Sequence, residues 1–430
     1  MAVSFRTVVV GFLCSLAAAC TSVPSLTPQA PPGDEAGVSP AARPLQVPPL
    51  TQLADGPARA LQGRFTRSDW SGLPGWNADD LAGVWGALVN DCKGLMRPIS
   101  GQLNLPARAN PRAWHGLCSE VQARDEAATP AGADLRRFLE QHLQAWRVND
   151  AAGKPARNTV TGYYEPTVRA SRRRHGVYQW PLYRTPDDLL TIDLGALYPE
   201  LAGKRVRGKL EGRRVVPYDT RAQIGRDAAR RPQAIVWVDD PVEAFFLQIQ
   251  GSGRAQLDDG SVIRLAYDNH NGHPYSSIAR WLADQGQMPL ARASMPNIKD
   301  WARRNPARVP EMLNANAAMV FFREETIHDP ALGPAGAYGI PLAAGRAIAV
   351  DAHFVPLGAP VWLSTTHPAS STPLQRLVFA QDTGAAIKGA ARADYYWGSG
   401  DAAGKAAGRM KQAGAMWVLW PRSAGEPSAR

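Results

Sequence analysis

Residues 379–401 read FAQDTGAAIKGAARADYYWGSGD, and this stretch carries two aspartates that raise different chemical expectations. Asp382 begins an Asp-Thr-Gly tripeptide of the kind found in aspartic proteases, and Asp394 precedes two tyrosines and a tryptophan. An aspartic protease needs two carboxylates that share one proton, and therefore one such loop on each of two lobes or subunits. The chain has a single Asp-Thr-Gly in 430 residues, so this hypothesis leaves most of the sequence unexplained.

Six short motifs occur in order along the chain, and the last of them lies in this stretch. They are 161-TGYYEP, 246-FLQIQGSG, 271-NGHPY, 321-FFR, 339-GIPL followed by 345-GRAIAVD, and 381-QDTG with Asp394. In order and spacing the series resembles the membrane-bound lytic transglycosylase A family over residues 60–422. The sequence departs from that pattern at Ala385, where a second glycine is expected after Asp-Thr-Gly.

The resemblance implies a mainly β fold with some α-helix. A double-psi β-barrel with N-terminal helices would be built from residues 56–165 and 314–425, and a second β-rich, barrel-like domain for substrate binding would be inserted at 166–313. The substrate groove is expected between them, as clefts at domain junctions often are. The residues also favour barrels or sandwiches, because short β-branched or aromatic runs alternate with turn residues. These runs begin at residues 159, 235, 245, 261, 318, 347 and 416.

The resemblance also implies three aspartates clustered in the barrel, Asp351, Asp382 and Asp394, with Asp394 as the catalytic acid and base. Glycosidic cleavage needs a carboxylic acid that is protonated near neutral pH, so apolar surroundings or a neighbouring negative charge must raise its pKa. The aromatic residues after Asp394 and a second aspartate would supply both. We expect Asp382 to position or polarise Asp394, and Asp351 to order the same hydrogen-bond network. The competing role for Asp382 is an Asx-turn before Thr-Gly.

The implied activity is that of a lytic transglycosylase, which cleaves the β-1,4 bond between N-acetylmuramic acid and N-acetylglucosamine in peptidoglycan. The 6-hydroxyl of the sugar attacks its own C1 and closes a 1,6-anhydro ring, so one residue suffices as acid and then base. A hydrolase would need a second carboxylate. The alternatives are a peptidoglycan-binding lipoprotein without turnover and an aspartic protease that uses Asp382.

Eight further residues are candidates for sugar binding because they carry aromatic rings or polar groups on these motifs. They are Tyr163, Tyr164, Glu165, Gln248, Gln250, Ser252, Tyr396 and Trp397. The alternation in 245-FFLQIQGSGR predicts a strand with a polar face toward sugar hydroxyls, although an ordinary solvated face fits equally well. Sheet packing is the competing role for the paired tyrosines. No cofactor or metal is expected, since His270 and His273 lack a third ligand at recognisable spacing.

The N-terminal residues read MAVSFRTVVVGFLCSLAAAC, which predicts a signal peptide over 1–19. Its apolar run is too short to span a bilayer, and small residues directly precede Cys20. This pattern resembles a bacterial lipoprotein processing site with an acylated Cys20, and Thr21 at the next position resembles the pattern sorted to the outer membrane. A plain secretory signal is the alternative. Residues 20–55 are rich in Pro and Ala, which predicts a tether. Residues 426–430 are expected to form a tail.

Helical periodicity is confined mainly to residues 77–148. Asp134 is expected as the N-cap of a helix whose apolar face continues through His142 to Trp146. Cys92 and Cys118 each lie on an apolar helical stripe. In an oxidising periplasm they form either a disulfide or two separately packed small hydrophobic residues, and the sequence does not decide between these.

The formal net charge of +10 is explained first by the solubility of a basic protein, and among specific neighbours it favours anionic cell wall or phospholipid surfaces. Nucleic acid is not expected, because the protein is exported and its basic residues form no motif with interleaved aromatics. The expected partners are peptidoglycan strands and the outer membrane, reached through the lipid anchor, with cell-wall synthases or scaffold proteins as further possibilities. A monomer that faces the periplasm is expected.

Overall fold

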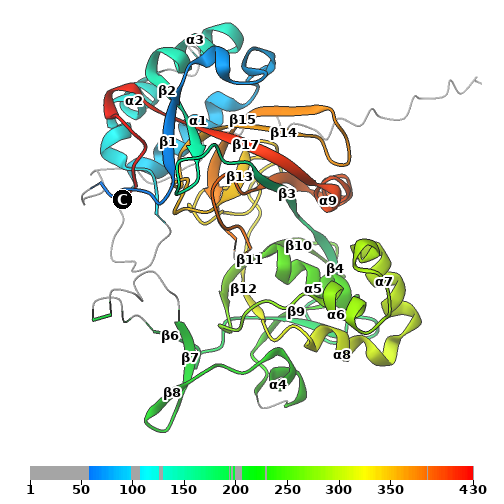
Figure 1. The fold of residues 1–430 in the computed structure, drawn as a ribbon. Coiled ribbons are helices and arrows are strands. Elements are labelled where there is room, and N and C mark those ends of the chain that lie inside the picture. The colour runs from blue at the N-terminus through cyan, green and yellow to red at the C-terminus, as the bar shows by residue number, and fades with distance from the viewer. Residues whose placement is uncertain are drawn as a thin grey trace, which may run out of the picture. The chain divides into compact units, whose positions relative to one another are not determined.

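The computed structural model describes residues 58–97, 107–124, 129–192, 194, 197–198, 206–227, 230–384 and 386–429. Within these ranges the chain forms three β-sheets and nine α-helices (Figure 1). The predicted signal peptide, the tether, Cys20 and Ala385 lie outside the described residues. None of the helices in these ranges is long and apolar enough to cross a membrane.

The largest sheet contains a closed ring of strands. Its order is β1-β2-β17-β14-β15-β13-β16-β3, and β3 pairs with β17 as well as with β16, so six of the eight strands close on themselves. The bounds are β1 (Arg64–Ser68), β2 (Leu143–Asn149), β3 (Asn158–Glu165), β13 (Ala347–Val350), β14 (Pro360–Thr366), β15 (Pro373–Asp382), β16 (Ala393–Ser399) and β17 (Lys411–Pro421). Two pairings, β13 with β15 and β16 with β3, are parallel. The prediction of a mainly β fold with a barrel is confirmed.

Large apolar side chains fill the barrel and the space between it and the neighbouring helices. Trp362, Phe379 and Trp420 are fully buried in this core, and Trp114 from a helix contacts Trp420 edge to face with ring centroids 5.7 Å apart. Such aromatic side chains bury large areas and dominate core energetics. The predicted runs at 347 and 416 are therefore barrel strands whose bulky residues face the core.

Four helices accompany the barrel, namely α1 (Val84–Met96), α2 (Pro111–Ala123), α3 (Gly132–His142) and α9 (Gly400–Arg409). The expectation for α3 was partly wrong. Its N-cap is Ala131, so Asp134 lies in the first turn, where a negative charge favours the helix dipole. Trp146 is not helical, because the chain turns directly into β2 at Leu143.

Cys92 on α1 and Cys118 on α2 form a disulfide, with Cα atoms 5.2 Å apart and both residues buried. The bond joins residues 26 positions apart and therefore restricts the unfolded chain. Replacing both cysteines by alanine should lower the free energy of unfolding by about 2–4 kcal/mol. Urea unfolding of wild type and the double variant, each with and without reductant, measures this. Reductant should lower the free energy of unfolding of the wild type only. If reductant leaves this value of the wild type unchanged, the disulfide has no stabilising role.

A second sheet of six strands follows β3 along the chain, in the order β12-β11-β10-β4-β9-β5. Its strands are β4 (Thr167–Ser171), β5 (Trp180–Tyr183), β9 (Ala234–Val238), β10 (Ser252–Leu257), β11 (Val262–His270) and β12 (Val320–Glu325). The edge strands β5 and β12 also contact each other, so the sheet is strongly curved. β12 pairs with β11, and the sheet therefore extends to Glu325, past the predicted domain boundary at 313.

Five helices accompany this sheet, although few helices were expected here. They are α4 (Arg221–Arg226), α5 (Pro241–Gln250), α6 (Ile278–Asp284), α7 (Met295–Arg304) and α8 (Val309–Asn314). The strand predicted at 245–253 is wrong, since α5 occupies most of it and β10 begins at Ser252. Local signals explain the helix: the Asp240 side chain accepts from two backbone N–H groups at its start, Pro241 follows, and Gly251 ends it with φ +79°.

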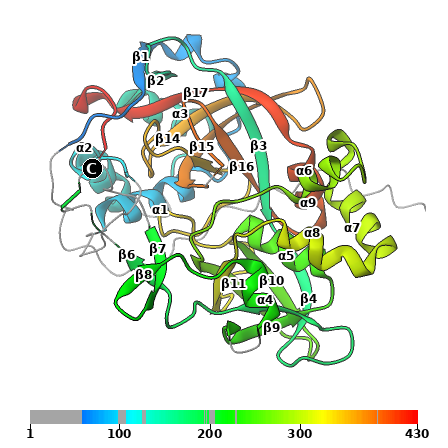
Figure 2. The same ribbon diagram turned by 60° about the horizontal axis from the view of Figure 1, so that its bottom comes forward.

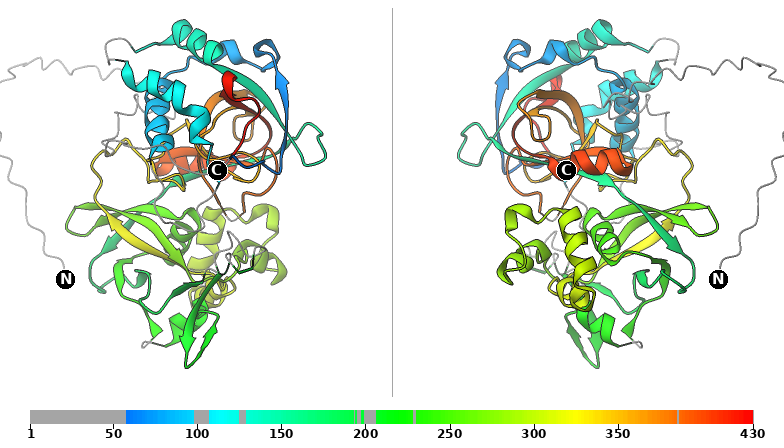
Figure 3. Two further views of the ribbon diagram at one scale, coloured as in Figure 1. Left: turned by 90° about the vertical axis from the view of Figure 1, so that its left-hand side faces the viewer. Right: turned by 90° about the vertical axis from the view of Figure 1, so that its right-hand side faces the viewer.

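A third, small sheet joins β6 (Leu190–Ile192), β7 (Val206–Glu211) and β8 (Arg214–Val216) in an antiparallel arrangement. Figures 1 and 3 show its β7–β8 hairpin (green) extending away from the six-stranded sheet. Gly212 in the connecting turn has φ +60°, a conformation that glycine adopts without strain.

Candidate active site

Strand pairing brings Asp394 and Asp382 to neighbouring positions in the barrel. Asp394 lies on β16 and Asp382 ends β15, and both are paired with Ala349 of the intervening strand β13. Residues paired in register point to the same face of a sheet. The two predicted catalytic carboxylates therefore come from opposite sides of one strand and share a face.

Asp394 is held by a residue of the adjacent strand β3. Its partner in the register is Thr161, whose hydroxyl donates a hydrogen bond of 2.6 Å to Oδ1 of Asp394. Burial raises the pKa of Asp394 to about 6, although the Thr161 hydrogen bond and the charge of Arg392 lower it and the charge of Asp382 raises it further. Oδ2 of Asp394 accepts no hydrogen bond from the described residues, so one oxygen of this carboxyl group remains available.

Asp382 is surrounded by donors. Its Oδ1 accepts from the backbone N–H groups of Ala337 (2.9 Å) and Thr383 (2.8 Å), and its Oδ2 accepts from the Tyr163 hydroxyl (3.1 Å). Burial nevertheless raises the pKa of Asp382 above its usual value. The Asp382 carboxylate bonds to the next backbone N–H, that of Thr383, and its charge acts on Asp394, so both roles considered for Asp382 stay predictions.

Asp351 lies one residue beyond β13, and its oxygens are also occupied. Its Oδ1 accepts from the backbone and ring of His353, and its Oδ2 accepts from the backbone of Gly389. Burial acts to raise the pKa of Asp351, but these hydrogen bonds outweigh it and the pKa is lowered. Its bonds fix the loop that leads to β16 rather than contacting Asp382 or Asp394, so the shared network that we expected is not formed directly.

Two contributing residues were missed in the sequence. Thr161 was part of a motif without an assigned role, and Arg392 was not considered. The Arg392 Nη2 donates to the Thr161 hydroxyl at 2.9 Å, which in turn donates to Asp394. Only the cross-strand register joins these positions, which are 231 residues apart, so no local sequence signal could have identified the pair.

Tyr163 and Tyr164 point to opposite sides of β3, as alternate strand residues do. Tyr163 contacts Asp382 and also the ring of Tyr396, with centroids 5.1 Å apart. The Tyr164 backbone N–H donates to Oε1 of Gln250 at 3.2 Å, and its ring lies close to α9, which runs beside β3 (Figure 2). Both tyrosines are half-buried, and Tyr163 touches the carboxylate cluster directly.

Glu165, which was expected to line the groove and bind sugar, is completely buried. Its Oε1 and Oε2 accept from the guanidinium groups of Arg264 (2.5 Å) and Arg254 (2.8 Å). The same two arginines also donate to the backbone carbonyl of Leu332. The two salt bridges connect the end of β3 to β10 and β11. Because both oxygens of Glu165 are engaged in them, this carboxylate has no free oxygen for a substrate.

The polar strand face predicted for Gln248, Gln250 and Ser252 does not exist, because α5 ends between them. Gln248 is buried and its Oε1 accepts from Arg221 at 2.7 Å. Gln250 is half-buried against Tyr164, and Ser252 is buried at the start of β10. Of the three, Gln250 alone contacts β3, through the backbone N–H of Tyr164.

Tyr396 and Trp397 also differ from the expected sugar-stacking arrangement. Tyr396 lies on the Asp394 face of β16 but is 1% exposed, packed below Gly333 and beside Tyr163. Trp397 lies on the opposite face, where its indole N–H points to the sulfur of Met410. The apolar surroundings of Asp394 therefore include one of the predicted aromatic residues on its own face.

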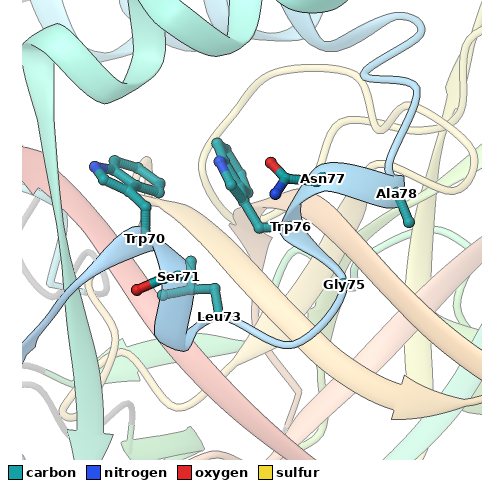
Figure 4. A pocket seen from close by; sticks show the side chains of 7 residues that line it. All are labelled: Trp70, Ser71, Leu73, Gly75, Trp76, Asn77 and Ala78. Carbon is teal, nitrogen blue, oxygen red and sulfur yellow. The ribbon is translucent and has the colours of Figure 1, made fainter.

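A shallow pocket of about 420 Å³ lies elsewhere, beside the short helical turns Trp70–Gly72 and Trp76–Ala78 (Figure 4). The residues that line it are Trp70, Ser71, Leu73, Gly75, Trp76, Asn77 and Ala78. It includes none of the predicted site residues. His270, considered above as a metal ligand, accepts from the Gly272 N–H within its own loop. The other candidate, His273, lies 2.7 Å from the Tyr218 carbonyl and so ties the loop to the segment before α4.

Two domain models match the chain. The MltA specific insert domain matches residues 159–323, which covers the six-stranded sheet from β4 almost to the end of β12. The 3D domain matches residues 346–420, the part that carries all three aspartates. The chain is also 29% identical over 345 residues to "Membrane-bound lytic murein transglycosylase A" of Escherichia coli K12, covering 77% of this chain and 86% of the relative.

Solved structures show the same similarity. MltA from Neisseria gonorrhoeae is 35% identical, with a TM-score of 0.71 and coverage of 91% of this chain and 99% of that one. The lytic transglycosylase LtgG of Burkholderia pseudomallei is 42% identical, with a TM-score of 0.55 and coverage of 86% and 99%. A membrane-bound lytic murein transglycosylase from Agrobacterium tumefaciens is 28% identical, with a TM-score of 0.71 and coverage of 84% and 98%.

Proposed function

This chain belongs to the membrane-bound lytic murein transglycosylase A (MltA) family, and we propose that Asp394 is the single acid and base with which it cleaves peptidoglycan. The bond cleaved is the β-1,4 bond between N-acetylmuramic acid and N-acetylglucosamine. Relatives over most of the chain are named as lytic murein transglycosylases, which supports the activity. The site geometry supports the assignment of Asp394.

The reaction needs one proton to move through one carboxyl group. Protonated Asp394 gives its proton to the glycosidic oxygen as the bond from that oxygen to C1 breaks. The 6-hydroxyl oxygen then bonds to C1, and its proton passes to the Asp394 carboxylate, which restores the acid. No water is consumed, and the intramolecular attack gains from proximity.

The observation that carries this proposal is the difference among the three aspartates. Asp382 and Asp351 accept hydrogen bonds at both oxygens, whereas Oδ2 of Asp394 accepts none from the described residues. Burial places the pKa of Asp394 at about 6, so the same group can donate and accept a proton near neutral pH. Asp382 is engaged by three donors and supplies negative charge rather than a nucleophile.

Sugar binding is assigned to half-buried residues around the end of β3, of which Tyr163 contacts Asp382, whereas Tyr164 and Gln250 lie on the other side of the strand. Tyr163, Tyr164 and Gln250 lie on β3 and at the end of α5, where the barrel leads into the inserted domain. Trp397, Tyr396, Glu165, Gln248 and Ser252 are better explained as supporting residues by their burial and contacts. A glycan strand in a groove between the two domains would meet the first group.

Mass spectrometry of the soluble products from purified peptidoglycan sacculi tests the activity. The expected muropeptides are one water lighter than hydrolysed counterparts, because they end in 1,6-anhydromuramic acid. Products with ordinary reducing ends would indicate a hydrolase and a second catalytic carboxylate. Absence of glycan cleavage would favour the non-catalytic binding lipoprotein, and peptide fragments alone would favour the protease.

The pH dependence follows from the raised pKa of Asp394. The value of kcat/KM should fall as the pH rises through about 6, because the glycosidic oxygen must receive a proton from the acid form. Asp382→Asn removes a negative charge that helps to raise this pKa, so the descending limb should move to lower pH. Asp401→Asn, in the exposed first turn of α9, should leave the limb in place. A rate independent of pH between 5 and 8 would contradict the assignment.

The localisation proposed is the periplasmic face of the outer membrane, with a monomeric enzyme attached through lipid on Cys20. Relatives named as membrane-bound support membrane association. The leader sequence before Cys20 supports the lipoprotein route. Mass spectrometry of the N-terminal peptide should show an acylated Cys20 as the first residue, whereas an unmodified mature N-terminus elsewhere would favour plain secretion. Cell-wall synthases or scaffold proteins are the proposed protein partners.

A further inference from the structure

The small sheet β6-β7-β8 has one entirely apolar face. In its register Leu190 is paired with Gly208, Ile192 with Val206, and Leu210 with Val215. Paired residues share a face, and alternate residues of one strand also share it. This face, called the aliphatic face, therefore consists of Leu190, Ile192, Val206, Gly208, Leu210 and Val215.

The opposite face carries the polar residues, and it is turned toward the rest of the protein. The Arg207 Nε donates to Oδ1 of Asn269 on β11 at 2.5 Å, and the Lys209 ammonium lies 2.9 Å from Asp219. Arg207 is 8% exposed and the Lys209 side chain 14%. The charged face is therefore buried at Arg207 and Lys209, where it meets the rest of the protein, and exposed at the hairpin end, where Glu211 is paired with Arg214 in the register.

The aliphatic face is correspondingly exposed. Leu210 is 62% exposed, Val215 50%, Val206 42% and Leu190 38%. Scattered exposed apolar residues are ordinary, but an uninterrupted apolar face usually marks an interaction site. Nothing among the described residues covers these four side chains.

Two exposed arginines lie at the end of the hairpin. Arg213 is in the turn, and Arg214 is paired with Glu211 in the register, so its side chain starts from the face opposite Leu210 and Val215. Arg213 and Arg214 are exposed and have no ion pair or hydrogen-bonding side-chain partner in the part of the chain that the structure describes. One acidic residue, Glu211, is nearby, and its carboxylate lies 3.6 Å from the Lys209 ammonium. The hairpin tip therefore combines aliphatic side chains with free positive charge.

We propose that the aliphatic face and the two tip arginines dock on an anionic phospholipid surface. Protein interfaces favour Trp, Tyr, Met and Arg anchors and under-use Leu and Val at their energetic centres, whereas this face is purely aliphatic. Guanidinium groups suit phosphate head groups, and each basic residue near an anionic bilayer adds to the attraction. The proposal rests on the lipid anchor proposed at Cys20, which would keep the hairpin close to a bilayer surface.

Vesicle co-sedimentation tests the aliphatic face. The chain from Thr21 onward lacks the lipid but keeps every described residue, and it is mixed with vesicles of phosphatidylethanolamine and phosphatidylglycerol. Leu210→Gln with Val215→Thr should lower the vesicle–water partition coefficient of the protein at least about tenfold, because less apolar surface is then transferred from water into lipid. The matched control, Leu290→Gln with Val262→Thr, removes side chains elsewhere that are 48% and 46% exposed and should bind like wild type.

The arginines are tested with vesicles of different charge. Arg213→Gln with Arg214→Gln should abolish the preference for phosphatidylglycerol over neutral phosphatidylcholine, while Arg303→Gln with Arg304→Gln on α7 should retain it. Equal binding by wild type and the Leu210/Val215 variant, or no binding by wild type, overturns the proposal. The proposal is also overturned if light scattering shows that the wild type is a dimer and the Leu210/Val215 variant a monomer, because a second copy would then cover the aliphatic face. Unchanged circular dichroism and thermal unfolding confirm that the variants are folded.

Discussion

Asp394→Asn should reduce the release of anhydro-muropeptides from sacculi by at least about 10³-fold, while the variant still binds glycan. General acid–base catalysis contributes about 10²–10⁴-fold for a positioned group, and here one group serves in both proton transfers. Asparagine keeps the size of the side chain and an oxygen that accepts from Thr161, so the site geometry is retained. Product quantification by mass spectrometry and sedimentation with sacculi measure turnover and binding separately.

The control for this variant is Asp401→Asn, seven residues further along on α9, which should keep wild-type turnover. Full activity in Asp394→Asn would exclude Asp394 as the acid. Loss of both turnover and glycan binding, together with a lowered melting temperature, would indicate that the substitution disturbs the fold instead.

The same substitution should stabilise the protein above neutral pH. The folded-state pKa of Asp394 is about 6 against an ordinary 3.8, so its contribution to stability is fully present below 3.8 and is lost as the pH rises through 6. Asparagine does not ionise and avoids this loss, which amounts to about 3 kcal/mol at most, at about 1.4 kcal/mol per pKa unit. Thermal unfolding of both proteins at pH 4 and pH 8 should show a gain for the variant at pH 8 only.

Glu165→Gln should destabilise the fold by about 3–5 kcal/mol. The substitution removes the negative charge between Arg254 and Arg264, and breaking a buried ion pair by removing one partner leaves an uncompensated buried charge. Glu165 is 0% exposed, so water cannot replace the lost interaction. Urea unfolding at constant pH gives the difference in free energy.

Glu324→Gln is the matched control, because Glu324 pairs with Arg172 at a partly exposed position. Its effect should stay below about 1 kcal/mol, as for other surface ion pairs. A Glu165 variant with unchanged stability but a raised KM would support the substrate-binding role expected from its motif, and would contradict the structural role argued here.

The barrel was predictable because its signals are short runs of strand-forming residues and motifs in a fixed order along the chain. The runs at 159, 347 and 416 are β-branched or aromatic, and each is a barrel strand. Asp394 and Asp382 were identified through motif order, and the structure places them on either side of Ala349. The pairing of Cys92 with Cys118 was left open by the sequence, since helical stripes show burial but not which stripes meet.

The errors have physical causes in the residues concerned. The run at 245–253 was taken as alternating, although Asp240-Pro241 and Gly251 are start and stop signals for a helix. Period-two alternation places Asp394 with Tyr396 and away from Trp397, and burial then decides that Tyr396 packs rather than stacks on sugar. The contacts of Thr161, Arg392 and Glu165 depend on strands distant in sequence, which no local pattern encodes.

Strand β3 carries three of the contacts described above at alternate positions. Thr161 bonds to Asp394, Tyr163 to Asp382, and Glu165 to the two arginines of the inserted domain. Successive residues of one strand face are roughly 6.6 Å apart, so the backbone sets the spacing among all three. Adding or deleting one residue between 161 and 165 would reverse which side chains face the carboxylates. Length variation among relatives should therefore be tolerated in surface turns such as 175–178 but excluded from this five-residue segment, whatever its composition.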